Sequence, residues 1–330
     1  MDHIAVDGSR GEGGGQTVRT ALALSCITGR PVSVRHIRHN RRVPGLRPQH
    51  VAATRILQQM CGGTMRGDRV GSDTLEFRPG TMRDSTITAD VGTAGSVPLV
   101  LQAAVPAAWA SGARLDLTVT GGTDVRWAPT ADYARLVMGA AYGGMGARLN
   151  VEVQRRGYYP RGGGRIRARV GRGRLAPAEL TACPSGGISV LCTQHGVDAA
   201  EDAESIAGEL ERAGHACTLE VSDQESTGPG AAILAYRTGR GFAAGADALY
   251  GNGFGGVAGR LLGCASIDEN LADMLVVPAS VAGGLSVFET GRLTKHLETT
   301  LYVSSTITGC RYGISRTGNG IQVRIRGAAT

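Results

Sequence analysis

A glycine-rich stretch near the start of the chain has the residue types of an anion-binding turn. Asp7-Gly-Ser-Arg-Gly-Glu-Gly-Gly-Gly-Gln16 precedes an apolar run that begins near Val18 and stops at Gly29. A turn of this kind presents unpaired backbone N–H groups at a helix start, where a phosphate can approach closely. Glu12 is placed to hold a divalent cation riding on that phosphate. The spacing fits neither a dinucleotide fingerprint nor a P-loop, so a purely structural turn stays an alternative.

Cationic side chains gather shortly afterwards. Five arginines fall within thirteen residues, at the end of a predicted strand and in the loop that follows it: Arg35, Arg38, Arg41, Arg42 and Arg47. A compact arginine patch is typical of sites that bind successive phosphates. Gln49 and His50 follow at the start of a predicted helix and can reach the same patch. The alternative is an ordinary solvated loop.

One histidine stands apart from the other six. His296 lies near the start of a predicted helix, the position that His50 takes earlier in the chain, and Thr299 and Thr300 fall one turn later on its face. No histidine pair has the spacing of a zinc site on a helix, and no Gly-x-Ser-x-Gly elbow or paired carboxylates emerge. The candidate site thus combines glycine-rich helix ends with arginines, one carboxylate and one histidine. This combination favours phosphoryl or nucleotidyl transfer. A structural histidine is the alternative.

The composition sets limits on the class of protein. The 330 residues carry a net charge of +7, nearly all of the cationic charge being arginine, which favours nucleic acid or a polyphosphate as partner. Seven cysteines are an odd number without a Cys-x-x-Cys pair, which indicates reduced thiols. With no signal sequence and no apolar run near the ~20 residues of a membrane span, we expect a cytoplasmic protein.

The elements that position these residues form one pattern three times. Copies of about 75 to 80 residues each read as helix, strand, helix, strand, strand, which predicts an α/β (α+β) fold of three lobes with the sheets on the inside. The chain from 177 to 264 has a different rhythm and predicts a small inserted α/β domain. The large domain then comprises 1–176 and 265–330.

Element limits follow from the apolar periodicity. For the first copy we predict helices at 16–28 and 48–61 with a strand at 31–38, and for the second, helices at 97–109 and from 130 to about 142. For the third we predict a helix from about 268, a strand at 285–290 and a helix-like segment at 293–308. The insertion is predicted to hold strands at 188–194, 216–222 and 231–237 around an acidic helix at 200–213.

Several motifs resemble those of the RNA 3'-terminal phosphate cyclase family. They occur in the family's order across all three copies: Glu12-Gly-Gly-Gly-Gln16 with Arg19, Pro44-Gly-Leu with Gln49-His50, Gly92-Thr-Ala-Gly-Ser96 with Leu99-Val-Leu-Gln102, Gly121-Gly-Thr-Asp124 with Ala128-Pro129, and Arg156-Gly-Tyr-Tyr-Pro-Arg-Gly-Gly-Gly-Arg-Ile166. The resemblance implies three βαβαββ-type repeats with a small inserted domain. It also implies an ATP-dependent conversion of an RNA 3'-phosphate into a 2',3'-cyclic phosphate through a histidine–AMP intermediate.

The resemblance also implies roles for individual residues. His296 matches the adenylated nucleophile, and Glu12 matches a carboxylate that binds Mg or Mn. The implied ATP pocket comprises Gln102, Asn270, Leu271, Ala272, Asp273 and Met274, and the implied substrate-binding residues are Gln16, Arg19, Arg38, Arg41, Gln49 and His50. The chain departs from the family at Thr299-Thr300, where Thr-Asn is frequent, and at Asn270, where an aromatic residue often stacks on adenine.

Two other functions share parts of this pattern. A non-catalytic relative serving ribosomal RNA maturation would have the same fold but would lack the nucleophilic histidine. An enolpyruvyl transferase uses similar repeats around an arginine-rich site and binds phosphoenolpyruvate instead of ATP. For a cyclase the partner is RNA with a 3'-phosphate end, with no membrane involved, and the oligomeric state is left open.

Overall fold

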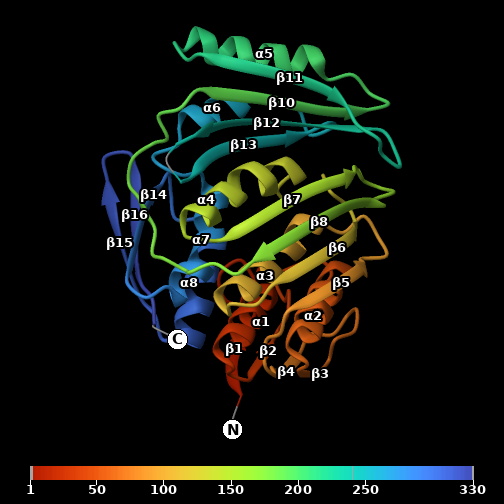
Figure 1. The fold of residues 1–330 in the computed structure, drawn as a ribbon, viewed down its shortest axis with the longest axis vertical. Coiled ribbons are helices and arrows are strands. Elements are labelled where there is room, and N and C mark those ends of the chain that lie inside the picture. The colour runs from red at the N-terminus through yellow and green to blue at the C-terminus, as the bar shows by residue number, and fades with distance from the viewer. Residues whose placement is uncertain (1–2, 240, 329–330) are drawn as a thin grey trace.

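The computed structural model describes residues 3–239 and 241–328 (Figure 1). The first repeat comprises β1 (Ile4–Asp7), α1 (Gln16–Thr28), β2 (Val32–Arg35), α2 (Pro48–Cys61), β3 (Thr64–Arg66) and β4 (Leu75–Arg78). The second comprises β5 (Ser85–Asp90), α3 (Val97–Ala110), β6 (Leu115–Gly121), the π-helical η1 (Tyr133–Met138) continuing into α4 (Gly139–Gly144), β7 (Arg148–Arg155) and β8 (Gly164–Gly171). The third comprises β9 (Glu179–Leu180), α7 (Glu269–Val281), β14 (Leu285–Thr290), α8 (Lys295–Thr308), β15 (Arg311–Thr317) and β16 (Gly320–Arg326).

The three repeats have the same sheet topology. Their strand orders are β1-β2-β4-β3, β5-β6-β8-β7 and β9-β14-β16-β15. In each sheet the first two strands are parallel, because a helix crosses between them, and the remaining pairs are antiparallel. The mixed α/β class and the βαβαββ-type repeat expected from the sequence are confirmed.

An insertion interrupts the third repeat between β9 and α7. It contains β10 (Ile188–His195), α5 (Ala200–Arg212), β11 (Cys217–Asp223), β12 (Gly230–Thr238), β13 (Ala243–Leu249) and α6 (Val257–Leu262). Its strands form a separate sheet, β11-β10-β12-β13, with its own cluster of buried apolar side chains under α5 and α6. We retain the division into a large and a small domain as a proposal, with β9 assigned to the third sheet of the large one.

The helices of the repeats lie between the sheets. Helices α1, α3 and α7 are buried along most of their length, and α1 packs against both α3 and α8 (Figure 1). The strands keep one face in water, as the alternating burial along β8 shows. The prediction that the sheets lie inside is therefore wrong: the helices carry the continuous apolar surface, and the strands are amphipathic.

The structure shifts some predicted limits. Helices α1 and α2 have the predicted bounds, but the strand predicted at 31–38 ends at Arg35. The chain leaves the sheet there because His36 and Arg38 adopt left-handed backbone conformations, with φ of 54° and 56°. Strands β1, β5, β9 and β13 and helix α6 were absent from the predicted elements.

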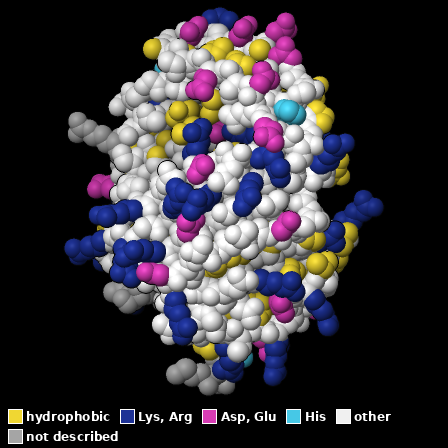
Figure 2. All heavy atoms as spheres, turned by 45° about the vertical axis from the view of Figure 1, so that its right-hand side comes forward, with side chains coloured by type: hydrophobic (Ala, Val, Ile, Leu, Met, Phe, Trp, Pro, Cys, Tyr) yellow, Lys and Arg dark blue, Asp and Glu magenta, His cyan; other side chains and the backbone are white. Residues whose placement is uncertain are grey.

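Charge is unevenly distributed over the molecule. Acidic side chains gather at the end of the molecule formed by α5, whereas arginines are spread over the repeats (Figure 2). The helices that the structure describes all lack the combination of length and apolar character that crossing a bilayer requires.

Candidate active site

Helix N-termini from different repeats surround two adjoining cavities. The first cavity, of ≈ 660 Å³, is lined among others by Arg38, Arg47, Gln49, His50 and Tyr159. The second cavity, of ≈ 640 Å³, is lined among others by Gln102, Asp247, Asn270, Asp273 and Met274. Both volumes suit a nucleotide-sized ligand. The wall common to both cavities includes Glu12, Gln16, Arg19, Arg41 and His296.

The side chain of Gln16 fixes the orientation of the His296 ring. Its amide nitrogen donates to Thr300 Oγ1 at 2.6 Å and to Asp273 Oδ2 at 3.0 Å, which leaves its oxygen facing His296 Nδ1. That oxygen can only accept, so Nδ1 carries a proton and Nε2 keeps a lone pair. The ring nitrogen with a free lone pair is therefore Nε2.

His296 is neutral at neutral pH. Burial lowers the pKa of the imidazole below its ordinary value, and the positive charges of Arg19 and Arg41 lower it further. Its side chain is nevertheless half-exposed, so the ring combines a neutral state with access to the cavities. The hydroxyl of Thr300, one turn later, donates to the carbonyl of His296 at 3.0 Å.

Glu12 lies beside this imidazole. Its Oε2 is 3.6 Å from His296 Nδ1, and its carboxylate forms an ion pair with Arg41. The backbone N–H of Glu12 donates to Thr299 Oγ1 at 2.9 Å, which ties the glycine-rich turn to α8. This approach requires glycine at position 11, where φ is +68° and a side chain would overlap Thr299.

A resident metal site is not built here. Within residues 3–239 and 241–328, no group of three or more histidine, cysteine, aspartate or glutamate side chains is placed to hold a metal ion. A single carboxylate that reaches both cavities does fit Mg²⁺ or Mn²⁺ arriving on a polyphosphate, since such ions take one or two protein carboxylates and complete their shell with phosphate oxygens and water.

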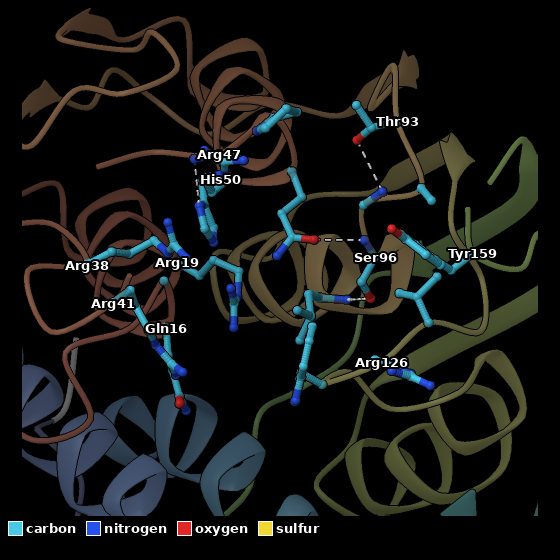
Figure 3. Close-up of a pocket in the computed structure, with 18 of the residues that line it drawn as sticks. Gln16, Arg19, Arg38, Arg41, Arg47, His50, Thr93, Ser96, Arg126 and Tyr159 are labelled. Atoms are coloured by element: carbon cyan, nitrogen blue, oxygen red, sulfur yellow. Dashed lines mark hydrogen bonds between the residues drawn. The ribbon is translucent and has the colours of Figure 1, made fainter. Parts of the chain in front are cut away.

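Three of the five predicted patch arginines line the first cavity: Arg38, Arg41 and Arg47. Figure 3 shows Arg38, Arg41 and Arg19 together on one side of it. Arg38 Nη1 donates to the carbonyls of Val43 and Gly45, which fixes the guanidinium. Arg35 and Arg42 are exposed and lie outside the described lining of both cavities.

Arg19, from α1, is enclosed between the two cavities. Burial lowers the pKa of its guanidinium to about 10, although the Asp273 carboxyl raises it. The same enclosure raises the pKa of Asp273 to about 7. An anion entering either cavity would add negative charge beside Arg19 to that of Asp273.

His50 and Gln49 hold helix ends at the edge of the first cavity. His50 is 3 % exposed, and its Nδ1 accepts a hydrogen bond from the backbone N–H of Arg47, which caps α2. Burial, with nearby Arg19, Arg38 and Arg47, lowers the pKa of His50 to about 3. Gln49 Oε1 accepts from the N–H of Ser96 at 2.8 Å, joining α2 to the start of α3 (Figure 3).

Four of the six residues expected for ATP line the second cavity: Gln102, Asn270, Asp273 and Met274. Leu271 and Ala272 point into the hydrophobic core, both at 0 % exposure. Pro129 and the inserted segment, through Asp247 and Arg260, complete the wall.

The sequence predictions did not include several lining residues. Arg126 and Trp127 belong to the wall of both cavities, and Tyr159 to that of the first. A signal existed: aromatic residues make up only 4 % of this chain, and both aromatics lie inside loops whose flanking motifs are distinctive.

Comparisons with known proteins agree with this arrangement. A family model described as RNA 3'-terminal phosphate cyclase matches residues 10–314. Proteins named RNA 3'-terminal phosphate cyclase are similar over nearly the whole chain: one from Methanococcoides burtonii is 35 % identical, covering 98 % of this chain and all of the relative. One from Methanothermobacter thermautotrophicus is 38 % identical, covering 94 % and 96 %, and one from Thermococcus onnurineus is 38 % identical, covering 94 % of each. Repeats, site and matches together establish that the chain belongs to the RNA 3'-terminal phosphate cyclase family.

Proposed function

We propose that this protein is an ATP-dependent cyclase that converts an RNA 3'-phosphate into a 2',3'-cyclic phosphate through a covalent His296–AMP intermediate. The observation that carries the proposal is the position of His296 in the wall shared by the two cavities. A nucleophile that takes adenylate from one ligand and gives it to another must reach both. The second cavity is assigned to ATP and the first to the RNA end.

In the first step, His296 Nε2 attacks the α-phosphorus of ATP. A phosphorus–nitrogen bond forms, the bond to the bridging oxygen breaks, and pyrophosphate leaves. Gln16 Oε1 keeps its hydrogen bond to Nδ1–H while the ring gains positive charge, and Arg19 and Arg41 face the phosphates.

A divalent cation held by Glu12 would neutralise charge on the departing pyrophosphate. Arg41 is paired with the Glu12 carboxylate in the structure. A cation held by Glu12 would take the place of this guanidinium, which would then be available to contact phosphate.

In the second step, an oxygen of the RNA 3'-phosphate attacks the same phosphorus. The phosphorus–nitrogen bond breaks, neutral His296 is regenerated, and an RNA–adenylate anhydride forms. Arg38, Arg41 and Arg47 line the first cavity, and in this proposal they bind the RNA phosphate. The neighbouring 2'-hydroxyl then attacks the 3'-phosphorus and gives up its proton to solvent. The bond from this phosphorus to the bridging oxygen of the anhydride breaks, and AMP leaves with that oxygen. Proximity drives this ring closure, because nucleophile and electrophile belong to one ribose.

The state of the cysteines supports a reducing, cytoplasmic setting for this reaction. All seven lie within the described residues and are unpaired thiols there.

The test is covalent labelling with ATP that carries the label on its α-phosphate. We expect an acid-labile protein adduct that is lost in His296→Ala and His296→Asn and retained in His50→Ala. His36→Ala, a change at an exposed histidine paired with Asp7, is the matched surface control. Thin-layer analysis of a 3'-phosphorylated oligoribonucleotide treated with ATP and Mg²⁺ or Mn²⁺ should then show a cyclic end.

Two results would contradict the proposal. If the adduct is lost in His50→Ala but not in His296→Ala, the nucleophile is the histidine of the first repeat, and the proposal has chosen the wrong one. Absence of any adduct in the wild type, with RNA binding intact, would favour a non-catalytic binding protein.

A further inference from the structure

Two exposed aromatic side chains border the first cavity. Trp127 is 95 % exposed and Tyr159 is 74 % exposed, and both line this cavity. Large aromatic side chains normally bury most of their surface, and the other tryptophan, Trp109, does so at 1 % exposure. Exposed aromatics at the mouth of a cavity therefore indicate a ligand that covers them.

The loop of Trp127 is held rigidly by its neighbours. Asp124 accepts from Thr123 Oγ1 at 2.6 Å and from the N–H of Ala131 at 2.9 Å. Arg126 Nη2 donates to the carbonyl of Gly251 at 3.1 Å. Between these anchors Trp127 has φ of 62°, a left-handed conformation that is unfavourable for a bulky residue. The surrounding contacts thus hold the backbone from which the exposed indole projects.

The loop of Tyr159 belongs to the same rigid unit. Thr123 N–H donates to the carbonyl of Gly157 at 2.9 Å, which joins the two loops. Arg156, 1 % exposed, forms ion pairs with Asp124 at 3.3 Å and Asp132 at 2.6 Å. One buried guanidinium therefore holds the base of both aromatic loops.

The chemistry of the first cavity suits a nucleotide whose phosphate and base lie at opposite ends. Tyr159 and Arg126 lie on the side away from Arg38 and Arg41 (Figure 3). A phosphate held by these arginines would direct the attached nucleoside towards the aromatic side. Bases of unpaired RNA are commonly bound by stacking on such side chains, whereas bases inside a duplex have both faces covered by their neighbours in the stack.

We propose that Trp127 and Tyr159 stack on the last bases of the RNA, so that the site selects an unpaired 3' end. This inference rests on the proposed function, because it takes the first cavity as the RNA site. The adenine of ATP is the other base to consider, since Trp127 also reaches the second cavity. Tyr159 decides between them, because among the described lining residues it belongs to the first cavity alone.

The first measurement is binding without catalysis. Trp127 is the exposed tryptophan of the two, so quenching of its fluorescence reports a base stacked on it. A 3'-phosphorylated single-stranded oligoribonucleotide, added without ATP, should quench the wild type and fail to quench Trp127→Phe. The same oligonucleotide with abasic sites at its last two positions should quench little. Equal quenching by both oligonucleotides would overturn the inference.

The second measurement separates RNA from ATP. Trp127→Ala and Tyr159→Ala should each raise the KM for the single-stranded oligonucleotide by about 5- to 150-fold, the range of one base–aromatic stack. Labelling by ATP in the absence of RNA should be unchanged in Tyr159→Ala, because among the described lining residues Tyr159 belongs to the first cavity alone. Trp127→Phe should have a KM close to that of the wild type. Tyr312→Ala, which removes a 43 % exposed tyrosine from β15, is the control.

The outcomes are distinct. An unchanged KM in both alanine variants, or loss of ATP labelling in Tyr159→Ala, overturns the stacking of RNA bases. Base-dependent quenching in a wild type that forms no adduct supports the stacking and overturns the proposed catalytic function instead. A blunt duplex with a 3'-phosphate should be a poorer substrate than the single strand for the wild type and should lose this disadvantage in the double variant Trp127→Ala/Tyr159→Ala.

Discussion

Gln16 sets the tautomer of the proposed nucleophile. Both hydrogens of its amide nitrogen have acceptors, on Thr300 and Asp273, and its oxygen faces His296 Nδ1. The amide belongs to the first turn of α1 and the imidazole to α8, 280 residues later. The types of these residues were evident in the sequence, but their meeting was not, because it depends on how two distant helix ends pack.

Replacing Gln16 with leucine should slow His296 adenylation by about 100-fold, the order of loss seen when the partner that orients an imidazole is removed. The leucine keeps the approximate volume and removes the acceptor. The rate of label incorporation from ATP measures the effect. A Gln16→Leu variant with wild-type kinetics and an unchanged melting temperature would show that the ring needs no such partner.

Adenylation should depend on pH through the same ring. Because burial and the arginines lower the pKa of His296, the neutral form persists below the ordinary value of 6.5, and the acid limb should have its midpoint below 6.5. Asp273, whose pKa is raised to about 7, ionises above this range. The profile of Asp273→Asn should therefore keep the His296 limb and lose any change near pH 7. A midpoint above 6.5 in both proteins would contradict this assignment.

At the scale of elements, equivalent helices of different repeats have acquired different tasks. Helices α2 and α8 occupy the same place in their repeats, and each has a histidine in its first turn. His50 caps α2 and is buried, whereas His296 is half-exposed between the cavities. Sequence position alone could not separate the two roles, because it is the surrounding packing that differs.

His50→Ala should lower the free energy of unfolding by about 2 kcal/mol, combining the loss of a cap with the loss of buried volume. Urea denaturation at pH 7 measures this change. Its effect should shrink at lower pH, because the neutral His50 of the folded state has a pKa of about 3 and costs the wild type stability below its unfolded pKa of 6.5. If His50→Ala and the wild type have the same free energy of unfolding at pH 7, the capping role is excluded.

The sequence predicted the long helices more accurately than the strands. Helices α1 and α2 have strong periodicity and clear glycine ends, so their bounds match the prediction. Strands β1 and β9 have four and two residues, too few for a periodic signal. Without β9, the repeat appeared to begin after the insertion, when in fact its first strand precedes it.

At the scale of the whole molecule, charge separates the acidic end at α5 from the arginine-rich repeats (Figure 2). Opposite charges on the two parts would orient a polyanion before contact. The net charge of +7 could be counted from the sequence. That the acidic insertion and the basic repeats lie at different ends of the molecule is known only from the structure.

The KM for RNA should therefore rise with salt. For single strands the slope of log KM against log salt is about 0.7 per neutralised phosphate. Arg47→Gln, which alters the first cavity, should reduce the slope by about this amount, whereas Arg311→Gln on β15 should leave it unchanged. Steady-state kinetics between low and physiological salt give both slopes. Equal slopes in the wild type and Arg47→Gln would show that Arg47 holds no phosphate.

The insertion after β9 supplies more than an appended lobe. Asp247 from β13 accepts a hydrogen bond from Thr130 N–H at 2.7 Å and, with Arg260, forms one side of the second cavity. A shortened protein, with Leu180 joined to Cys264 by a brief linker, would retain the strands of all three sheets. Its second cavity would lack the wall that the insertion provides and would be open to solvent on that side. The segment that interrupts the third repeat therefore also encloses the second cavity.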